Sequence, residues 1–367
     1  MNQNLEPVLG THKAMVLLAN ALTKVGLPLL DSAVKASTVP FTTPEMIRPN
    51  IHSKYYGWTH YGIFFPDLPT PHKYCNIMTL LGATGATIFD NDYLIKTDPR
   101  DTATFFSSTA AKGVYHYQAY SIANECQIVE EGSLIQFGDH LTISGTYPEY
   151  HVRATYGDFQ LDVAIQCTDQ VGWFLRNVIY DHFSLLAKCS GTMTYAGVTT
   201  PIERLCTFEY ARCVSPHSVT KKILPDSWKL PIDFFTYQII NADESTQILL
   251  TDARSLGTSA FKGIHIRSLT GDAQIHVNDV DFKITAYQDK PAIDSEGRTM
   301  RLPKTFSWVV RDKGQAILSI NCTIDAEWRY GHGRGYASCY RFTGEFNGKS
   351  FDGQGYIEYI DCETLSQ

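Results

Sequence analysis

The chain has 367 residues with a net charge of −7; 44% of its residues are hydrophobic and 19% are charged. This length exceeds one ordinary domain, and the composition is that of a globular protein with a sizeable core. The acidic balance, without a block of Lys and Arg, argues against a nucleic-acid partner and against binding to an anionic membrane surface. No apolar stretch reaches 18 residues, so we expect no stable membrane insertion.

The nine cysteines include no Cys-x-x-Cys pair. This usage is typical of a reduced cytoplasmic protein with buried thiols, and the spacing predicts no metal site. Near the start, residues 11–36 are predicted to be helical up to Val25, where Gly26 and Pro28 stop or kink the helix. Lys24 and Pro28 interrupt the apolar run, so the segment is expected to be a cap on the fold and not a signal peptide.

Strand signals follow almost without a break after a Pro- and Thr-rich connector. In the clearest of them Phe159, Leu161, Val163 and Ile165 share one face, and polar residues occupy the other. Half-buried strands with short turns predict an antiparallel sandwich or barrel. The strands expected in the first half are 55–65, 74–81, 88–95, 114–122, 126–129, 133–137, 141–146 and 159–167.

Two stretches of the chain, 180–210 and 330–359, resemble each other. Each opens with Tyr-x-His, at Tyr180 and again at Tyr330, and each closes with Glu-Tyr, at Glu209 and Glu358. Order is kept while the offset drifts, as loop insertions in two homologous domains would produce. The predicted organisation is an N-terminal helix and connector (1–50), a first barrel (51–215), a linker (216–230) and a second barrel (231–367).

Short motifs rich in Gly and aromatic residues suggest a family. The first strand, Tyr55-Tyr-Gly-Trp-Thr-His-Tyr61-Gly, and the close Gly353-Gln-Gly-Tyr-Ile-Glu358 resemble bacterial tandem lipocalin-like (calycin) proteins. These include the carotenoid 1,2-hydratase (hydroxyneurosporene synthase) group and related bacterial families of unknown function. More distantly, the chain resembles tocopherol cyclases and fungal lipocalin-like Diels–Alderases. The resemblance implies two consecutive lipocalin-like antiparallel β-barrels in an all-β chain with an N-terminal helical segment. It also implies cofactor-free hydration, cyclisation or isomerisation of an apolar molecule.

His182 and Glu209 are the main candidates for proton transfer. On a strand, Tyr180 and His182 share one face and Asp181 lies on the other. The His182 imidazole could then orient or protonate a substrate through the Tyr180 phenol, as a general acid–base unit. A Glu209 carboxyl on an inward barrel face would have a raised pKa and could protonate an alkene or enol. The alternative is structural, with Tyr-x-His as a strand-entry feature and Glu209 paired with Arg204 or Arg212.

Further residues could complete a site with these two. On the first strand Trp58 and His60 share one face and Tyr61 takes the other, so His60 and Tyr61 are candidate polar groups for catalysis. Trp58 and Trp173 would form an aromatic wall suited to a polyene or a developing carbocation. Tyr180 would also contact the substrate, and Arg334, in a glycine-rich turn, could hold a carboxylate at a barrel mouth. Each of these is also ordinary for a barrel core.

We therefore predict a cofactor-independent isomerase, cyclase or hydratase acting on an apolar, isoprenoid- or polyketide-like small molecule. Its pocket would lie in the first barrel or at the junction of the barrels, with no cofactor and no metal. The alternative is a non-catalytic carrier of a fatty-acid- or terpenoid-like ligand, and a third class is a structural protein with filled barrels. These classes differ in whether polar groups with shifted pKa values converge inside the protein.

Overall fold

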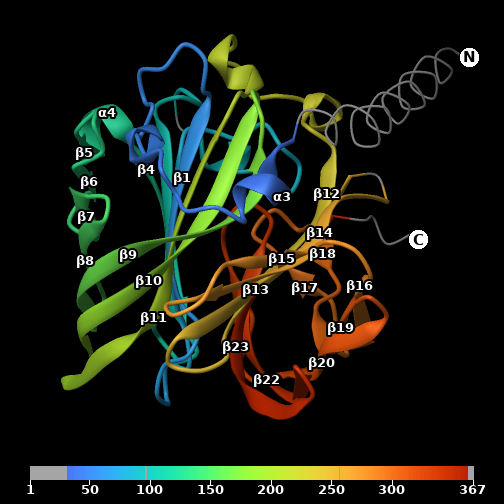
Figure 1. The fold of residues 1–367 in the computed structure, drawn as a ribbon. Helices are drawn as coiled ribbons and strands as arrows, with labels where there is room; N and C mark the ends of the chain where they lie inside the picture. The colour runs from blue at the N-terminus through green and yellow to red at the C-terminus, as the bar shows by residue number, and fades with distance from the viewer. Residues whose placement is uncertain (1–30, 96, 256, 363–367) are drawn as a thin grey trace, which may run out of the picture.

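A computed structural model describes residues 31–95, 97–255 and 257–362, and almost all of its regular structure is strand (Figure 1). The first sheet has 11 antiparallel strands in the order β4-β3-β2-β1-β11-β10-β9-β8-β7-β6-β5. They are β1 (Trp58–Phe65), β2 (Cys75–Leu81), β3 (Thr102–Thr109), β4 (Tyr115–Ser121), β5 (Cys126–Ile128), β6 (Leu134–Phe137), β7 (Leu141–Thr146), β8 (Glu149–Tyr156), β9 (Phe159–Arg176), β10 (Tyr180–Tyr195) and β11 (Val198–Cys213).

The first sheet curls into a nearly closed barrel. Its two edge strands, β4 and β5, follow each other in sequence and are joined by the short helix α4 (Ile122–Glu125). Side chains bridge this seam, because the Tyr120 hydroxyl lies 2.9 Å from His140 Nδ1 and the Tyr120 ring packs on Phe137. Closing the sheet in this way leaves little of either edge free to pair with another chain.

The second sheet is a half-barrel of ten strands in the order β15-β14-β13-β12-β23-β22-β20-β19-β16, with β21 paired to β22. A two-stranded hairpin, β17–β18, stands apart. The strands are β12 (Ile232–Asn241), β13 (Thr246–Ser255), β14 (Thr258–Ser268), β15 (Gln274–His276), β16 (Val280–Tyr287), β17 (Ala292–Ile293), β18 (Thr299–Met300), β19 (Pro303–Asp312), β20 (Gln315–Ile324), β21 (Arg329–Tyr330), β22 (Tyr336–Phe346) and β23 (Lys349–Asp361). The expected all-β fold class is confirmed. The first of the two expected barrels is nearly closed, and the second is an open half-barrel.

Helical structure in the described residues is limited to short turns. They are α3 (Ala33–Ala36), α4, η2 (Pro44–Met46), η3 (Asp92–Leu94), η4 (Pro216–Ser218) and η5 (Asp226–Trp228). The helix predicted up to Val25 lies outside the described residues. Within the described part of the chain, a helix with the length and apolarity to span a membrane is not found.

The strand predicted over 88–95 does not form, and this segment is a loop that contains η3. Its polar side chains bind backbone N–H groups nearby: Asp90 accepts from the N–H of Asp92 and Asn91 accepts from the N–H of Thr84. Asp and Asn side chains that compete for the backbone in this way favour turns over ladders. The expected strand 114–122 is present as β4, one residue shorter at each end.

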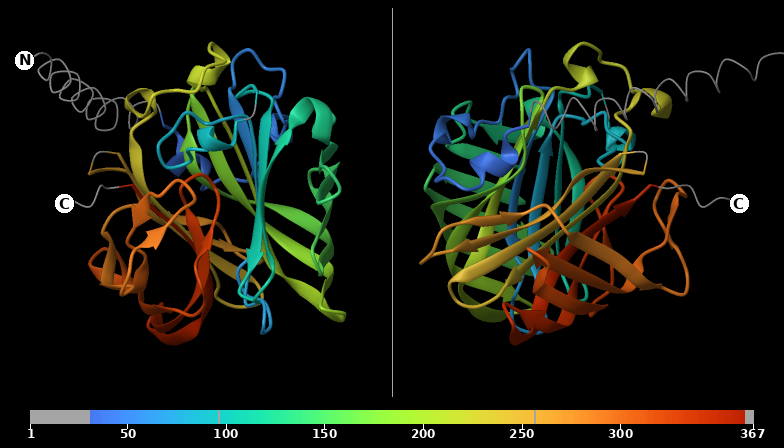
Figure 2. Two further views of the ribbon diagram at one scale, coloured as in Figure 1. Left: turned by 180° about the vertical axis from the view of Figure 1, so that it is seen from behind. Right: turned by 45° about the vertical axis from the view of Figure 1, so that its right-hand side comes forward.

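Both faces of the central strands are buried, which decides where the site lies. All eight residues of β1 are buried. Tyr61, Ile63 and Phe65 belong to the core inside the first barrel, whereas Phe64 packs in a second core together with residues of the second sheet. The half-barrel therefore covers the outer face of the barrel (Figure 1 and Figure 2). The central strands of the barrel therefore have a buried core on each of their two faces, one inside the barrel and one between the barrel and the half-barrel.

Candidate active site at the junction of the two sheets

A group of ionisable side chains is buried between the barrel and the half-barrel. We call it the junction cluster, and its members are His60, His182, Glu209, His332 and Glu358. Glu209 lies opposite Gly62 of β1 and Ser184 of β10 in the strand register, so its side chain faces the second sheet. It is only 3% exposed.

Glu209 is held by two imidazoles. His182 Nε2 lies 2.6 Å from Glu209 Oε1, and His60 Nε2 lies 3.7 Å from the same oxygen. The other carboxylate oxygen, Oε2, is buried and has no hydrogen-bond partner in the described part of the chain. Burial would raise the pKa of Glu209, but His182 and His60 outweigh burial and lower it to about 2. Glu209 is therefore an ionised carboxylate at neutral pH.

Tyr180, His182 and Glu209 form a chain of hydrogen bonds. The Tyr180 hydroxyl lies 3.0 Å from His182 Nδ1, as expected for residues two apart on one strand. With Glu209 ionised, His182 Nε2–H donates to the carboxylate, and Nδ1 is left to accept from the Tyr180 hydroxyl. This order of hydroxyl, imidazole and carboxylate is the arrangement that lets a carboxylate fix the tautomer of a histidine.

His60 is the second histidine beside Glu209. Its Nδ1 lies 2.8 Å from the carbonyl oxygen of Thr79, and a carbonyl only accepts, so Nδ1 carries a proton. Nε2 is the ring atom that faces the Glu209 carboxylate, 3.7 Å from Oε1. Gly62 leaves room for this ring, because a Cβ there would lie 2.9 Å from His60 Nε2.

The second half of the chain supplies His332. Its ring centroid lies 5.4 Å from that of His60 and 4.7 Å from that of Phe89. His332 adopts a φ of 60°, which is uncommon for a residue with a side chain. Burial and the neighbouring His60 lower its pKa well below the ordinary value, so the ring is neutral.

Glu358 is the protonation counterpart of Glu209. It is buried on β23, and the Tyr356 hydroxyl donates to its Oε1 at 3.1 Å. Burial, with the negative charge of Glu209 adding to it, raises the pKa of Glu358 well above its ordinary value. Two carboxyl groups near one site are therefore held in opposite protonation states, a pattern that marks acid and base partners.

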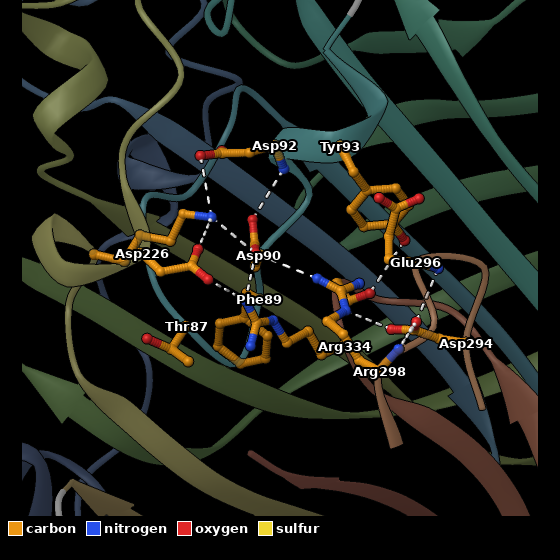
Figure 3. Close-up of polar contacts among 12 residues, drawn as sticks. Thr87, Phe89, Asp90, Asp92, Tyr93, Asp226, Asp294, Glu296, Arg298 and Arg334 are labelled. Carbon is orange, nitrogen blue, oxygen red and sulfur yellow. Dashed lines mark hydrogen bonds and ion pairs between the residues drawn. The ribbon is translucent and has the colours of Figure 1, made fainter. Parts of the chain in front are cut away.

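A buried ionic network anchors the loops above the cluster (Figure 3). Asp90 accepts from Arg334 at 2.9 Å and from Lys229 at 2.8 Å, and Lys229 also contacts Asp226 at 3.0 Å. Arg298 joins the network through Asp90 at 3.5 Å and also binds Asp294 at 2.6 Å. Asp90 lies on the loop before β3, Arg334 on the loop that carries His332, and Lys229 between the sheets. The network therefore fixes His332 over the cluster.

The structure brings together some of the residues predicted from sequence and separates others. His60, His182, Glu209 and Tyr180 meet, and Trp58 lies beside Tyr180 with ring centroids 5.5 Å apart. Tyr61 and Trp173 point into the core of the first barrel, on the other side of the sheet. Arg334 binds Asp90, so its guanidinium is already paired.

Glu209 lies on the other face of its strand from the one that the catalytic hypothesis required. Its carboxyl does not face the inside of the barrel, so the rise in pKa expected for that position does not occur, and its pKa is lowered. Neither proposed arginine pairs with it, because Arg204 binds Asp67 and Arg212 binds Asp181. The reason is that Arg204 and Arg212 lie an odd number of residues from Glu209 on β11, so their side chains point to the opposite face of the strand.

Neither His332 nor Glu358 was predicted as a site residue, and the sequence carries no signal for Arg267. His332 and Glu358 belong to the second copies of the Tyr-x-His and Glu-Tyr motifs, and this repetition is the signal that could have identified them. Arg267 lies on β14 and follows an alternation of isoleucine with polar residues, which predicts an exposed side chain, yet it is fully buried. In the described residues, no group of three or more His, Cys, Asp or Glu is placed to hold a metal ion.

A groove of about 1320 Å³ lies along the strands that carry the cluster. Its lining includes Lys188 on β10, Leu205 on β11 and Asn241 at the end of β12. Leu205, Thr207 and Glu209 lie on one face of β11, so the groove ends roughly 13 Å along the strand from Glu209. The groove is larger than the usual range for sites that bind small molecules.

Comparison with solved structures places the fold among known ones. A protein of Nitrosomonas europaea provisionally assigned to AttH is 12% identical with a TM-score of 0.58, and the match covers 88% of this chain and 98% of that one. Kievitone hydratase of Nectria haematococca is 11% identical with a TM-score of 0.57, over 88% of this chain and 94% of that one. A third structure, CghA, has a TM-score of 0.42 and is too distant to support an argument.

These likenesses show a shared fold and no more, because the identities are low. No curated protein matches the sequence. A family model does match, over residues 78–367, and it is described as a family of unknown function (DUF6670). Since this match covers most of the chain, the protein belongs to the DUF6670 family.

Proposed function

We propose that the protein is a cofactor-independent enzyme that moves protons on an apolar small molecule, and that hydration of a carbon–carbon double bond is its best-supported reaction. One observation carries the proposal. Glu209 and Glu358 are buried near one site and are held in opposite protonation states, with His60 and His182 on the ionised one. A resident acid and a resident base are what such a reaction needs.

In the proposed reaction, the ionised carboxylate of Glu209 accepts a proton from water through Oε2, the oxygen that has no partner among the described residues, as the water oxygen bonds to one alkene carbon. The π electrons move to the other carbon, which takes a proton from the neutral carboxyl of Glu358. His182 and His60 hold the Glu209 carboxylate in place. One water supplies both the hydroxyl and, after proton return to Glu358, the added hydrogen, so the site is regenerated.

The kinship of fold with a hydratase is consistent with this proposal. The more specific resemblance to the carotenoid 1,2-hydratase group, and an isoprenoid- or polyketide-like substrate, remain part of the proposal. So does the assignment of Trp58 and Tyr180 to the substrate side of the cluster. The groove that ends at Leu205 is the proposed route of entry.

The test uses an extract of apolar metabolites from the natural host and buffer made with ¹⁸O-labelled water. We expect the wild-type protein to convert a compound to a product 20 mass units heavier, the mass of labelled water, by mass spectrometry. Glu209→Gln and Glu358→Gln should each lose this conversion, whereas Glu345→Gln, at an exposed residue of β22 outside the groove and the cluster, should retain it. Conversion that survives both cluster variants would refute the assignment of the site.

The volume of the groove supports one other function, a carrier whose ligand undergoes no reaction. A carrier would release an unchanged compound on solvent extraction of the protein purified from its host. It would also show no label incorporation, and Glu358→Gln would leave the amount of bound compound unaltered.

A further inference from the structure

Arg267 is a fully buried guanidinium that contacts only neutral groups. It lies on β14 of the second sheet and has 0% exposure. Its Nη1 donates to the Ser184 carbonyl oxygen at 2.6 Å and to the Ser184 hydroxyl at 3.2 Å, and its Nη2 donates to Oε1 of Gln247. The Nε–H is buried and has no partner in the described residues.

Other arginines of this protein form ion pairs with carboxylates. Arg254 binds Asp252 at 2.6 Å and Arg298 binds Asp294 at 2.6 Å, although both are partly exposed. Arg267 makes no ion pair among the described residues, and a buried cation without a carboxylate partner opposes folding. Burial lowers its pKa to about 10, so it is still charged at neutral pH. A charge retained at such a cost suggests a role other than stability.

The donors around Arg267 converge next to the junction cluster. The Ser184 hydroxyl accepts from Arg267 and also from the Tyr237 hydroxyl at 3.4 Å, which leaves the proton of Ser184 free to donate. Ser184 is the cross-strand neighbour of Glu209. A guanidinium N–H and a hydroxyl proton are thus available beside the proposed acid–base groups. Buried, fixed donors of this kind stabilise an oxygen on which negative charge develops.

The charge of the groove lining limits which ligands can bring an oxygen atom to these donors. Asn241 lines the groove and accepts from Gln247, which in turn holds Arg267, so Arg267 lies two side chains behind the groove wall. Acidic side chains outnumber basic ones along the groove, so an anionic ligand is repelled at entry. The acidic lining residues are Asp67, Glu149, Glu203, Asp243 and Glu244, against Lys188 and Arg204. A neutral molecule with a polarisable oxygen fits both features.

We propose that Arg267 and Ser184 bind the carbonyl oxygen of a neutral, apolar α,β-unsaturated carbonyl compound and stabilise the enolate formed when water adds to it. This inference rests on the proposed function and narrows its substrate class. As water bonds to the β-carbon and loses its proton to the Glu209 carboxylate, the π electrons move to the carbonyl oxygen. The enolate then collapses and takes a proton from Glu358 at the α-carbon. Water is the only co-reactant.

The experiment uses 2-naphthol as the probe, because its ionised oxygen resembles that of an enolate and its two forms fluoresce differently. We expect the wild-type protein to lower the titration midpoint of bound naphthol by at least about one pH unit, which is a tenfold preference for the anion. Arg267→Met should abolish this shift. Arg311→Met removes the same charge from an exposed site of the second sheet and should leave the shift unchanged.

Folding of each variant is checked by circular dichroism and urea unfolding. If Arg267→Met does not fold, Ser184→Ala serves as the second variant and should reduce the shift without abolishing it. The proposal is overturned if wild-type protein binds no naphthol, if bound naphthol titrates as in water, or if the shift persists in folded Arg267→Met. Glu358→Gln separates the two proposals, because it should stop hydration and still bind the naphtholate. A naphtholate shift without any hydration would refute the reaction and leave the oxyanion site standing.

Discussion

Replacing Glu358 by glutamine should stabilise the protein, and the gain should grow with pH. The side chain is buried, and its pKa is raised well above the ordinary value of 4.5. An acid with a raised folded pKa takes up a proton on folding, so its contribution to stability falls as pH rises from 4.5 toward the folded pKa. A glutamine of the same shape carries no such proton and keeps an oxygen that accepts from Tyr356.

The magnitude follows from linkage. In the pH range between the unfolded and the folded pKa, the wild type loses about 1.4 kcal/mol of unfolding free energy for each pH unit, relative to Glu358→Gln. Between pH 5 and pH 7 the difference should therefore grow by up to about 2–3 kcal/mol. Urea unfolding of both proteins at pH 5, 6, 7 and 8 measures it.

Glu209→Gln provides the matched comparison for the pH dependence of stability, because it makes the same substitution at the equivalent position of the first sheet. Here the folded pKa is lowered from 4.5 to about 2, so the contribution of the carboxylate is present above pH 4.5 and lost as pH falls toward 2. Glu209→Gln should lower the unfolding free energy at pH 7 by about 3 kcal/mol and by much less at pH 3. A difference between wild type and Glu358→Gln that stays constant from pH 5 to 8 would refute the reasoning.

Three further predictions concern the support of the cluster. Gly62→Ala places a Cβ 2.6 Å from a phenylalanine ring atom, so it should cost about 1–3 kcal/mol in urea unfolding and reduce turnover; Gly271→Ala, with no contact under 3.8 Å, should do neither. Asp90→Asn removes a negative charge that pairs with the buried Lys229, so it should lower the unfolding free energy by about 3–5 kcal/mol. Asp279→Asn alters an exposed ion pair and should leave the urea midpoint unchanged. Tyr180→Phe removes the hydroxyl on the neighbouring imidazole and should cost about 1 kcal/mol. It should also shift the pH profile of turnover, and an unchanged profile would contradict the hydrogen-bonded chain.

Local patterns in the sequence were sufficient for several elements. The alternation at Phe159, Leu161, Val163 and Ile165 predicts a strand with one buried face, and these residues lie in the core of the first barrel. The spacing of Tyr180 and His182 predicts that they share a face, and their side chains are hydrogen-bonded. Both results follow from the two-residue period of a strand, which can be read from a few neighbouring residues of the sequence.

The same period explains what the sequence left open. Alternation divides a strand into two faces but does not say which face points into the barrel, and here both are buried. Only the packing of the half-barrel on the outer face made His60 and Glu209 interior groups and left Tyr61 in a separate core. The loop at 88–95 was misjudged because its side chains bind backbone N–H groups that a strand would have used in its ladder.

By itself, then, the sequence determined the class of fold, many of the strands and the residue pairs that share a face, but it predicted a false strand at 88–95 and missed β3 and β8. The meeting of His332, Glu358 and Arg267 with the first barrel was decided by tertiary structure alone. These residues come from a second sheet, at sequence separations over which no periodicity carries information. Their protonation states depend on neighbours across the junction, since Glu209 and Glu358 close equivalent stretches of sequence and yet differ in charge.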